Sequence, residues 1–448
     1  MKYKIILSFM FAALFSAFLF TGSSDKPVVR SSSDAQAEAV TTASDTEVTG
    51  TETVTETETV TTAFTTTTAV TTTEPPEPPA DHVMNAPDTV EVYTDITLEE
   101  FITERNVELK DGSAVLDTSE VGTFEVEVPY YYEGSEFSQI LRYRVADTTK
   151  PLIINPGNNS YHKVNTAFDI QNYIGYADNY DANPVLTCEG EVDSDTVGSY
   201  PLVATVTDSS GNSVTWDLTV NVIEKAKTSA DQIPRVDYSD FIRRYENDDV
   251  RFGIDVSAWQ ADIDFNAVRD AGCSFVMIRI GYYYSKITLD DYFRQNLKNA
   301  VNAGLDVGIY FYTTDRTEEG VREHVRWITE QLEGQKLTLP IAFDWEEFSH
   351  FQKYGMSIRD LNDVYAAFAD EVTKQGYKPM LYSSKNFLNI IWSEKSKRLS
   401  PVWLAHYVKE TNYEGDYAIW QASAYGRIPG INGDVDMDIQ YLSQKLDG

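Results

Sequence analysis

The chain has 448 residues, 42% of them hydrophobic, and its 70 acidic against 36 basic side chains give a formal net charge of −34. This length predicts about two to four domains. The acidic balance argues against nucleic acid as a partner, because binding phosphates requires clustered cationic side chains. Cys188 and Cys273 are the two cysteines and fall in segments assigned below to different domains, which argues against a disulfide framework and a cysteine-ligated zinc site.

Residues 1–24 have the order of a secretory signal. Lys2 and Lys4 precede an apolar run from Ile5 to Phe20, and small and polar residues follow it. The run is shorter than the roughly 20 residues that span a bilayer, although an uncleaved anchor would need only modest adjustments. The sequence therefore predicts an exported protein, secreted or held at the cell surface, whose only contact with a membrane would be an uncleaved N-terminal anchor.

Residues 25–82 form a predicted linker rich in Thr, Glu and Pro. Between Thr41 and Thr73, 18 of 33 positions are Thr, and the run ends in the prolines of residues 75–79. Such a composition buries too little apolar surface to offset the cost of ordering the chain. We expect a disordered, extended stalk that is open to O-glycosylation.

Short alternating apolar runs, typical of half-buried strands, occupy residues 83–224. The strands are expected at 123–128, 140–145, 200–206 and 214–222, and an internal repeat aligns Asp117–Phe124 with Asp193–Tyr200. The pattern predicts two small all-β sandwiches, residues 83–147 and 148–224. The Val-Gly-Ser/Thr-Tyr/Phe turn in each resembles the immunoglobulin-like modules common on bacterial exported proteins. We expect the two modules to act as a spacer, with binding to the cell wall as the alternative.

A polar hinge, residues 225–249, leads into a last domain, residues 250–448, in which strands and helices alternate. Apolar strands are expected at 252–255, 275–280, 307–312, 341–344, 380–382, 402–405 and 418–421. Helices are expected at 290–303, 317–332 and 357–374, each opened by a capping residue. This alternation predicts a (β/α) barrel of the TIM-like type, whose chemistry would lie at the carboxyl ends of the strands.

Acidic residues stand at those ends. Asp255 ends the first strand, Asp344 and Glu346 end the fourth, and Asp436 follows the last turn. Residues at i and i+2 of an extended segment point to the same side, so Asp344 and Glu346 can both face the barrel mouth. When two carboxyl groups are adjacent, their pKa values diverge, so one stays charged and the other keeps its proton near neutral pH. The cleavage of a glycosidic bond requires this division.

Seven motifs in one order resemble glycoside hydrolase family 25, the lysozymes that act as N-acetylmuramidases, over about residues 250–445. They are Gly253-Ile-Asp-Val-Ser-x-x-Gln260, Phe275-Val-Met-Ile-Arg-Ile-Gly281, Ala303-Gly-x-x-x-Gly-Ile-Tyr-x-Tyr312, Phe343-Asp-Trp-Glu346, Trp403-Leu-Ala-x-Tyr407, Trp420-Gln421 and Val435-Asp436. The resemblance implies hydrolysis of the β-1,4 bond between N-acetylmuramic acid and N-acetylglucosamine in peptidoglycan, the expected partner.

The same resemblance implies the roles of the acids. Glu346 would be the general acid, and Asp344 would stabilise the 2-acetamido group of the substrate as that group attacks the anomeric carbon. Asp255 and Asp436 would support them, with Asp438 a weaker candidate. Seven residues are expected to bind substrate through aromatic, amide or cationic side chains: Tyr310, Tyr312, Tyr382, Trp403, Tyr407, Gln421 and Arg279. The arginine could equally pair with an acidic residue of the barrel.

Two other functions stay open at this point. One is the hydrolysis of another N-acetylhexosamine polymer such as chitin, and the other is a noncatalytic adhesin whose barrel binds cell-wall glycan. The five histidines have no metal-ligand spacing, so we expect an enzyme that needs no metal or cofactor. We also expect a monomer.

Overall fold

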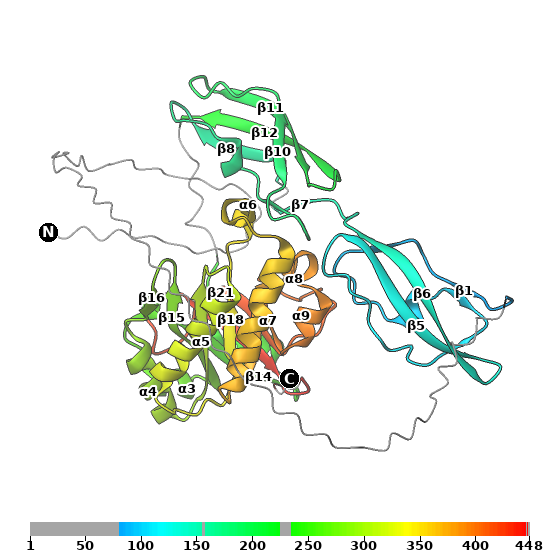
Figure 1. The fold of residues 1–448 in the computed structure, drawn as a ribbon. Coiled ribbons are helices and arrows are strands. Elements are labelled where there is room, and N and C mark those ends of the chain that lie inside the picture. Colours follow the sequence, from blue (N-terminus) through cyan, green and yellow to red (C-terminus); the bar gives the residue numbers. More distant parts are fainter. Residues whose placement is uncertain (1–79, 155–156, 225–233, 445, 447–448) are drawn as a thin grey trace, which may run out of the picture.

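The computed structural model describes residues 80–154, 157–224, 234–444 and 446 (Figure 1). The predicted signal, residues 25–79 of the predicted linker and residues 225–233 of the predicted hinge lie outside the described residues. Within the described part of the chain, no helix combines the length and the apolar character that crossing a membrane requires.

The first module, within residues 80–147, joins a four-stranded sheet to a two-stranded one. In the larger sheet β5 and β6 form a long hairpin whose two-residue turn, Glu133-Gly134, has positive φ at both positions, as a type I′ turn requires. The sheet order is β2-β6-β5-β4, and β2 runs parallel to β6. The elements are β1 (Met84–Asn85), β2 (Thr89–Glu91), α1 (Leu98–Phe101), β3 (Glu104–Arg105), β4 (Glu108–Leu109), β5 (Gly122–Tyr132) and β6 (Ser135–Ala146).

The second module repeats this arrangement. Its four-stranded sheet has the order β8-β12-β11-β10 with β8 parallel to β12, and β7 pairs with β9. Gly122 and Gly198, equivalent in the sequence repeat, open the equivalent strands β5 and β11. The immunoglobulin-like assignment itself stays a prediction. The elements are β7 (Leu152–Ile153), β8 (Asn159–Lys163), η1 (Ile170–Asn172), β9 (Tyr176–Ala177), β10 (Val185–Glu189), β11 (Gly198–Thr207) and β12 (Ser213–Ile223).

Eight strands of the C-terminal domain close into a barrel. The ring runs β14-β15-β17-β18-β19-β20-β21-β22, and β22 pairs back with β14. The short strands β13 and β16 attach to β21 and β15. The strands are β13 (Val236–Asp237), β14 (Val250–Val256), β15 (Phe275–Tyr283), β16 (Ile287–Leu289), β17 (Asp306–Thr313), β18 (Ile341–Asp344), β19 (Pro379–Ser384), β20 (Val402–Ala405), β21 (Ile419–Arg427) and β22 (Val435–Tyr441).

The barrel differs from the expected TIM-like type in its last third. The ring strands β14, β15 and β17 to β21 are parallel, but β22 is antiparallel to both of its neighbours. The seven predicted strands did not include β22, and no helix separates β20 from β21 or β21 from β22. A short hairpin connection can join only antiparallel strands, so the turn before Val435 forces this reversal.

Helices pack on the outside of the barrel around a large apolar core. Phe343 of β18, for example, is fully buried against Tyr365 and Phe368 of α7. The helices are α2 (Tyr238–Tyr245), η3 (Ala258–Gln260), α3 (Phe265–Asp270), α4 (Phe293–Ala303), α5 (Glu318–Leu332), η4 (Phe348–His350), α6 (Phe351–Tyr354), α7 (Ile358–Lys374), α8 (Lys385–Ile390) and α9 (Glu394–Arg398). The three predicted helices correspond to α4, α5 and α7.

Both modules contact the start of α7. The Ile358 amide donates a hydrogen bond of 2.7 Å to the backbone carbonyl of Asp178 in the second module. The guanidinium of Arg359 lies 4.7 Å from the ring centroid of Tyr93 in the first module. Tyr93 in turn packs against Tyr180 of the second module at 5.6 Å. The first turn of α7 therefore connects the barrel domain with both β modules.

Candidate active site

The site acids come together because their strands are neighbours in the barrel. Asp255 on β14 is the register partner of Asp436 on the adjacent β22. Asp344, the last residue of β18, is paired with Tyr312 on one side and Tyr382 on the other. The charges of Asp255 and Glu346 both act on Asp436, so the four acids form one electrostatic group.

Trp345 explains why Asp344 and Glu346 share a side. Its ring is fully buried outside the barrel wall against Phe348 and Phe351, and its indole N–H donates to the Asp315 carbonyl at 3.1 Å. This anchoring turns the flanking acids away from that core. Asp344 is 6% exposed and Glu346 is more accessible, so Glu346 is the acid that a substrate reaches first.

The pKa of both acids is raised. Burial raises the pKa of Glu346 to about 7; a hydrogen bond with Asp344 opposes this rise, and the charges of Glu347 and Asp255 add to it. Burial, together with the charge of Glu346 and the hydrogen bond to it, raises the pKa of Asp344 well above its usual range, and Arg279 opposes this. The pair therefore retains a proton near neutral pH.

The sequence predicts a protonated Glu346 beside an anionic Asp344. Burial raises the pKa of both carboxyls, and a hydrogen bond joins them, so the proton belongs to the pair. The assignment of this proton to Glu346 stays a prediction.

The pKa values of Asp255 and Asp436 are also raised. Burial raises the pKa of Asp255 to about 6, against hydrogen bonds from Gln421 and Asp438. Burial and the charge of Asp255 raise the pKa of Asp436 well above its usual range. Asp438 is fully buried and accepts a hydrogen bond of 2.8 Å from the Trp403 indole, so it lies behind Asp255 rather than at the mouth.

The Gln421 side chain forms hydrogen bonds within the protein, whereas the sequence predicts that it binds substrate. It is 4% exposed, its amide N–H donates to Asp255 Oδ2 at 2.7 Å, and its amide oxygen accepts from the hydroxyls of Tyr382 (2.9 Å) and Tyr407 (2.7 Å). Both lone pairs of the oxygen are thereby used. Gln421 therefore positions Asp255 and two tyrosines instead of offering its amide oxygen to a sugar hydroxyl.

Trp403 also differs from its predicted role. It is 1% exposed and lies inside the barrel, where its ring meets Tyr382 edge to face at 4.8 Å and Tyr310 at 5.9 Å. It supports the tyrosines and presents no face to a ligand. Tyr310, Tyr312, Tyr382 and Tyr407 are partly exposed, as a lining requires.

Arg279 pairs with a barrel acid, one of the two roles considered for it. Its Nε and Nη2 lie 2.9 and 2.8 Å from Oδ2 of Asp290, whose side chain is completely buried. Asp290 also accepts from the backbone amides of Ala258 and Tyr292, both at 3.0 Å. The Arg279 charge still reaches Asp344 and lowers its pKa.

An aromatic wall lies on the Arg279 side of the site and consists of Trp259, Tyr282 and Tyr284, of which sequence reasoning missed Trp259. Trp259 is 63% exposed and lines a cavity of about 220 Å³ together with Tyr282 and Arg279. Tyr284 is 53% exposed, and its ring centroid lies 5.3 Å from that of Tyr312. The available signal was the position of Trp259 four residues after the predicted end of the first strand at Asp255.

Comparisons with known proteins agree with the resemblance. Residues 254–431 match the model of the glycosyl hydrolases family 25. The autolytic lysozyme of Clostridium acetobutylicum is 31% identical over 189 residues, which cover 42% of this chain and 54% of that protein. Lysozyme M1 of Streptomyces globisporus is 30% identical over 200 residues, which cover 41% of this chain and 65% of that protein. The chain thus spans between half and two thirds of these relatives.

Among solved structures, a bacterial lysozyme from Streptomyces coelicolor is 24% identical, with a TM-score of 0.36, and the match covers 45% of this chain and 94% of that one. Both curated relatives align with a part of the chain about as long as the barrel domain. The match over residues 254–431 and the two lysozyme relatives show that this C-terminal domain is similar to the glycosyl hydrolases of family 25.

Proposed function

We propose that the protein is an exported lysozyme that cleaves the β-1,4 bond between N-acetylmuramic acid and N-acetylglucosamine in peptidoglycan. The family match and the lysozyme relatives support this substrate. The observation that carries the proposal is the pair of Asp344 and Glu346, two carboxyls with raised pKa values that share a proton at the end of β18.

Glu346 acts as the general acid. It is the more accessible member of the pair, and its pKa of about 7 suits a group that must give up a proton and take it back near neutral pH. Its proton passes to the glycosidic oxygen as the bond between that oxygen and the anomeric carbon breaks. In the second half of the reaction the Glu346 carboxylate accepts a proton from the attacking water.

Asp344 binds and stabilises the acetamido group of the sugar. Its Oδ1 is buried and has no hydrogen-bond partner in the described protein, so it is ready to accept the N–H of a 2-acetamido group. A donor at this oxygen favours the anionic form of Asp344, so that Glu346 holds the shared proton. Anionic Asp344 stabilises the positive charge that develops when the acetamido oxygen attacks the anomeric carbon.

The remaining groups hold this arrangement. Asp255 and Asp436 keep the site negative and contact sugar hydroxyls and water, while Gln421 fixes Asp255. The partly exposed tyrosines and Trp259 offer flat faces to the apolar sides of the sugar rings. The two β modules and the Thr-rich segment, in our proposal, hold the barrel at the cell wall.

Digestion of purified peptidoglycan with the full chain tests the bond that is cut. Borohydride reduction of the products, followed by hydrolysis and sugar analysis, is expected to give reduced muramic acid, because a muramidase leaves N-acetylmuramic acid at the reducing end. Reduced glucosamine would contradict the assignment and indicate the other glycosidic bond. Release of N-acetylglucosamine oligomers from chitin at a comparable rate would favour the broader hydrolase, and binding without any product would favour the adhesin.

A further inference from the structure

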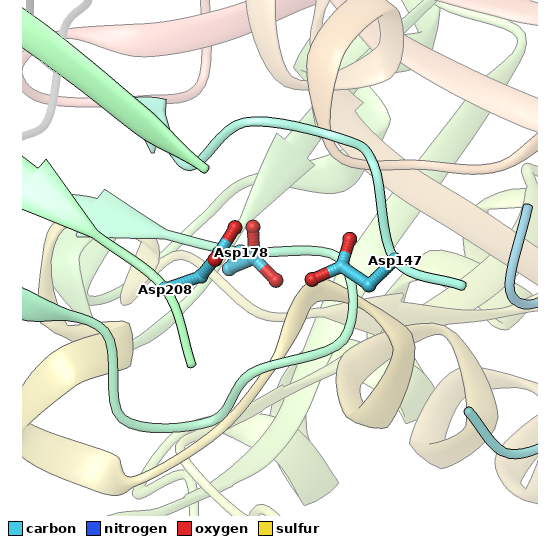
Figure 2. Close-up of side chains that lie close together, drawn as sticks. All are labelled: Asp147, Asp178 and Asp208. Atoms are coloured by element: carbon cyan, nitrogen blue, oxygen red, sulfur yellow. The ribbon is translucent and has the colours of Figure 1, made fainter. Parts of the chain in front are cut away.

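Three aspartates from the two β modules meet at the junction between them (Figure 2). Asp147 directly follows β6, the last strand of the first module, whereas Asp178 follows β9 and Asp208 follows β11 of the second. One carboxylate oxygen of each lies within 4.8 Å of one from both of the others. The side chains are all buried, with exposed fractions of 5%, 0% and 6%.

Half of the six carboxylate oxygens in this cluster lack a hydrogen-bond partner. Within the residues that the structure covers, neither oxygen of Asp147 nor Oδ2 of Asp178 has a hydrogen-bond partner of good geometry, and none of the three aspartates forms an ion pair. The Ser210 hydroxyl and the Thr149 amide lie close enough to Asp147 to lower its pKa without forming such a bond. Asn179 adds a further buried oxygen without a partner. Buried polar groups are normally satisfied, and unpaired buried carboxylates are among the most costly exceptions.

The other oxygens are held firmly in place. Asp178 Oδ1 accepts from the backbone amides of Tyr180 and Asp181 at 2.9 and 2.8 Å. Asp208 accepts from the backbone and side-chain amides of Asn212 at 2.8 and 2.9 Å, and the Asn212 side chain also donates to the Asp147 carbonyl at 3.2 Å. The turns thus fix three negative groups against one another without neutralising them.

We propose that Asp147, Asp178 and Asp208 bind a calcium ion at the junction of the two modules. The donors are oxygens throughout, and no histidine or cysteine belongs to the described cluster, which favours a hard cation over zinc or copper. Calcium takes six to eight oxygen ligands in flexible geometry, so carboxylates, backbone carbonyls and water can complete its shell. Magnesium requires near-ideal octahedral geometry and gives up its water reluctantly.

Burial supports the need for a cation. It raises the pKa of Asp178 to about 6, and the charges of Asp147 and Asp208 add to the rise against hydrogen bonds from two amides. Burial likewise raises the pKa of Asp147; the nearby Ser210 hydroxyl opposes this, and the charges of Asp208 and Glu91 add to it. A bound divalent cation removes this repulsion.

The ion would fix the first module against the second. Asp147 begins the connection between the modules, and the other two ligands come from loops of the second module. The same segment reaches the barrel domain, since the Asp178 carbonyl accepts from the Ile358 amide. Calcium at this point would therefore stiffen the connection between the N-terminal modules and the barrel, independently of the reaction that the barrel performs.

Thermal melting and calorimetric titration of the full chain test the site. After EDTA treatment and dialysis, CaCl₂ is expected to bind at one site with a Kd of about 10⁻⁴–10⁻³ M, the range of extracellular calcium modules. At 100 times the Kd, the ratio of folded to unfolded protein should rise about 100-fold, and Tm with it. MgCl₂ at equal ionic strength should give a smaller shift.

Substitutions of the aspartates distinguish a loss of calcium binding from a loss of folded structure. Asp147→Asn and Asp178→Asn should abolish the calcium-dependent rise in Tm and, in EDTA, should melt no lower than the unsubstituted chain, because each removes an unpaired buried charge. Asp217→Asn, an exposed aspartate on β12 of the second module, is the matched control and should keep the full calcium response. No saturable binding to the unsubstituted chain up to 10 mM CaCl₂, roughly ten times the weaker limit of that range, would overturn the proposal. So would a calcium response that survives both substitutions.

Discussion

Glu346→Gln is expected to reduce the rate of peptidoglycan cleavage by about 10²–10⁴-fold, the usual contribution of a positioned general acid. Glutamine keeps the size of the side chain and can still hydrogen-bond to Asp344, but it has no proton to give to the leaving oxygen. The measurement is the initial rate of release of reducing ends from purified peptidoglycan.

The matched control for this variant is Glu330→Gln, the same change on the exposed face of α5, which should retain full activity. Binding of peptidoglycan by Glu346→Gln should stay close to that of the unsubstituted chain, because the aromatic wall is untouched. A rate within about threefold of the unsubstituted chain would show that another group supplies the proton.

Asp344→Asn is expected to lower kcat by about 10²–10³-fold while changing KM little. Removal of one preorganised group that stabilises developing charge typically costs this much. Asparagine cannot carry the negative charge that balances the acetamido intermediate, although its amide oxygen can still accept a hydrogen bond from the sugar. The steady-state rate of cleavage of soluble glycan fragments, measured against their concentration, separates the two constants.

Asp264→Asn provides the control for the aspartate substitution. Asp264 caps α3 by accepting from the amides of Asn266 and Ala267, and asparagine caps helices about equally well. A large rise in KM with an unchanged kcat for Asp344→Asn would assign Asp344 to substrate binding alone.

The sequence predicted the central strands of the barrel well. Residues 341–344 and 402–405 form β18 and β20 with the predicted bounds, because continuous apolar runs of this length are typical of strands buried on both faces. β22 was missed although Val435–Tyr441 alternates in polarity, because its inward positions carry Asp436, Asp438 and Gln440 where a core strand would carry apolar side chains.

The sequence did not predict the directions of the side chains in the site. A position at a strand end predicts closeness to the mouth, but it does not say whether a ring points into the barrel or out of it. Trp403 therefore appeared as a candidate platform, whereas alternation along β20 places it inside the barrel while Val402 and Leu404 pack against the helices. The partners of Gln421 were equally hidden, since Asp255 is 166 residues away from it in sequence.

The calcium ligands left no readable pattern in the sequence. Asp147, Asp178 and Asp208 lie about 30 residues apart, each in a turn of a kind in which aspartate is common for local reasons. Their convergence depends on how the two modules pack against each other.

The account depends most on the buried acids sharing a proton near neutral pH, and a ¹³C NMR titration of the Glu346 carboxyl tests this directly. Chain labelled at the glutamate side-chain carboxyls, with the Glu346 signal assigned by its loss in Glu346→Gln, is expected to show a midpoint near pH 7. A carboxyl whose folded-state pKa is raised contributes stability below its unfolded pKa and loses it as the pH rises through the folded pKa. Glu346→Gln should therefore become more stable relative to the unsubstituted chain as the pH rises from 4.5 to about 7. A midpoint near the ordinary glutamate value of 4.5 would contradict the shared proton, and with it the proposed general acid.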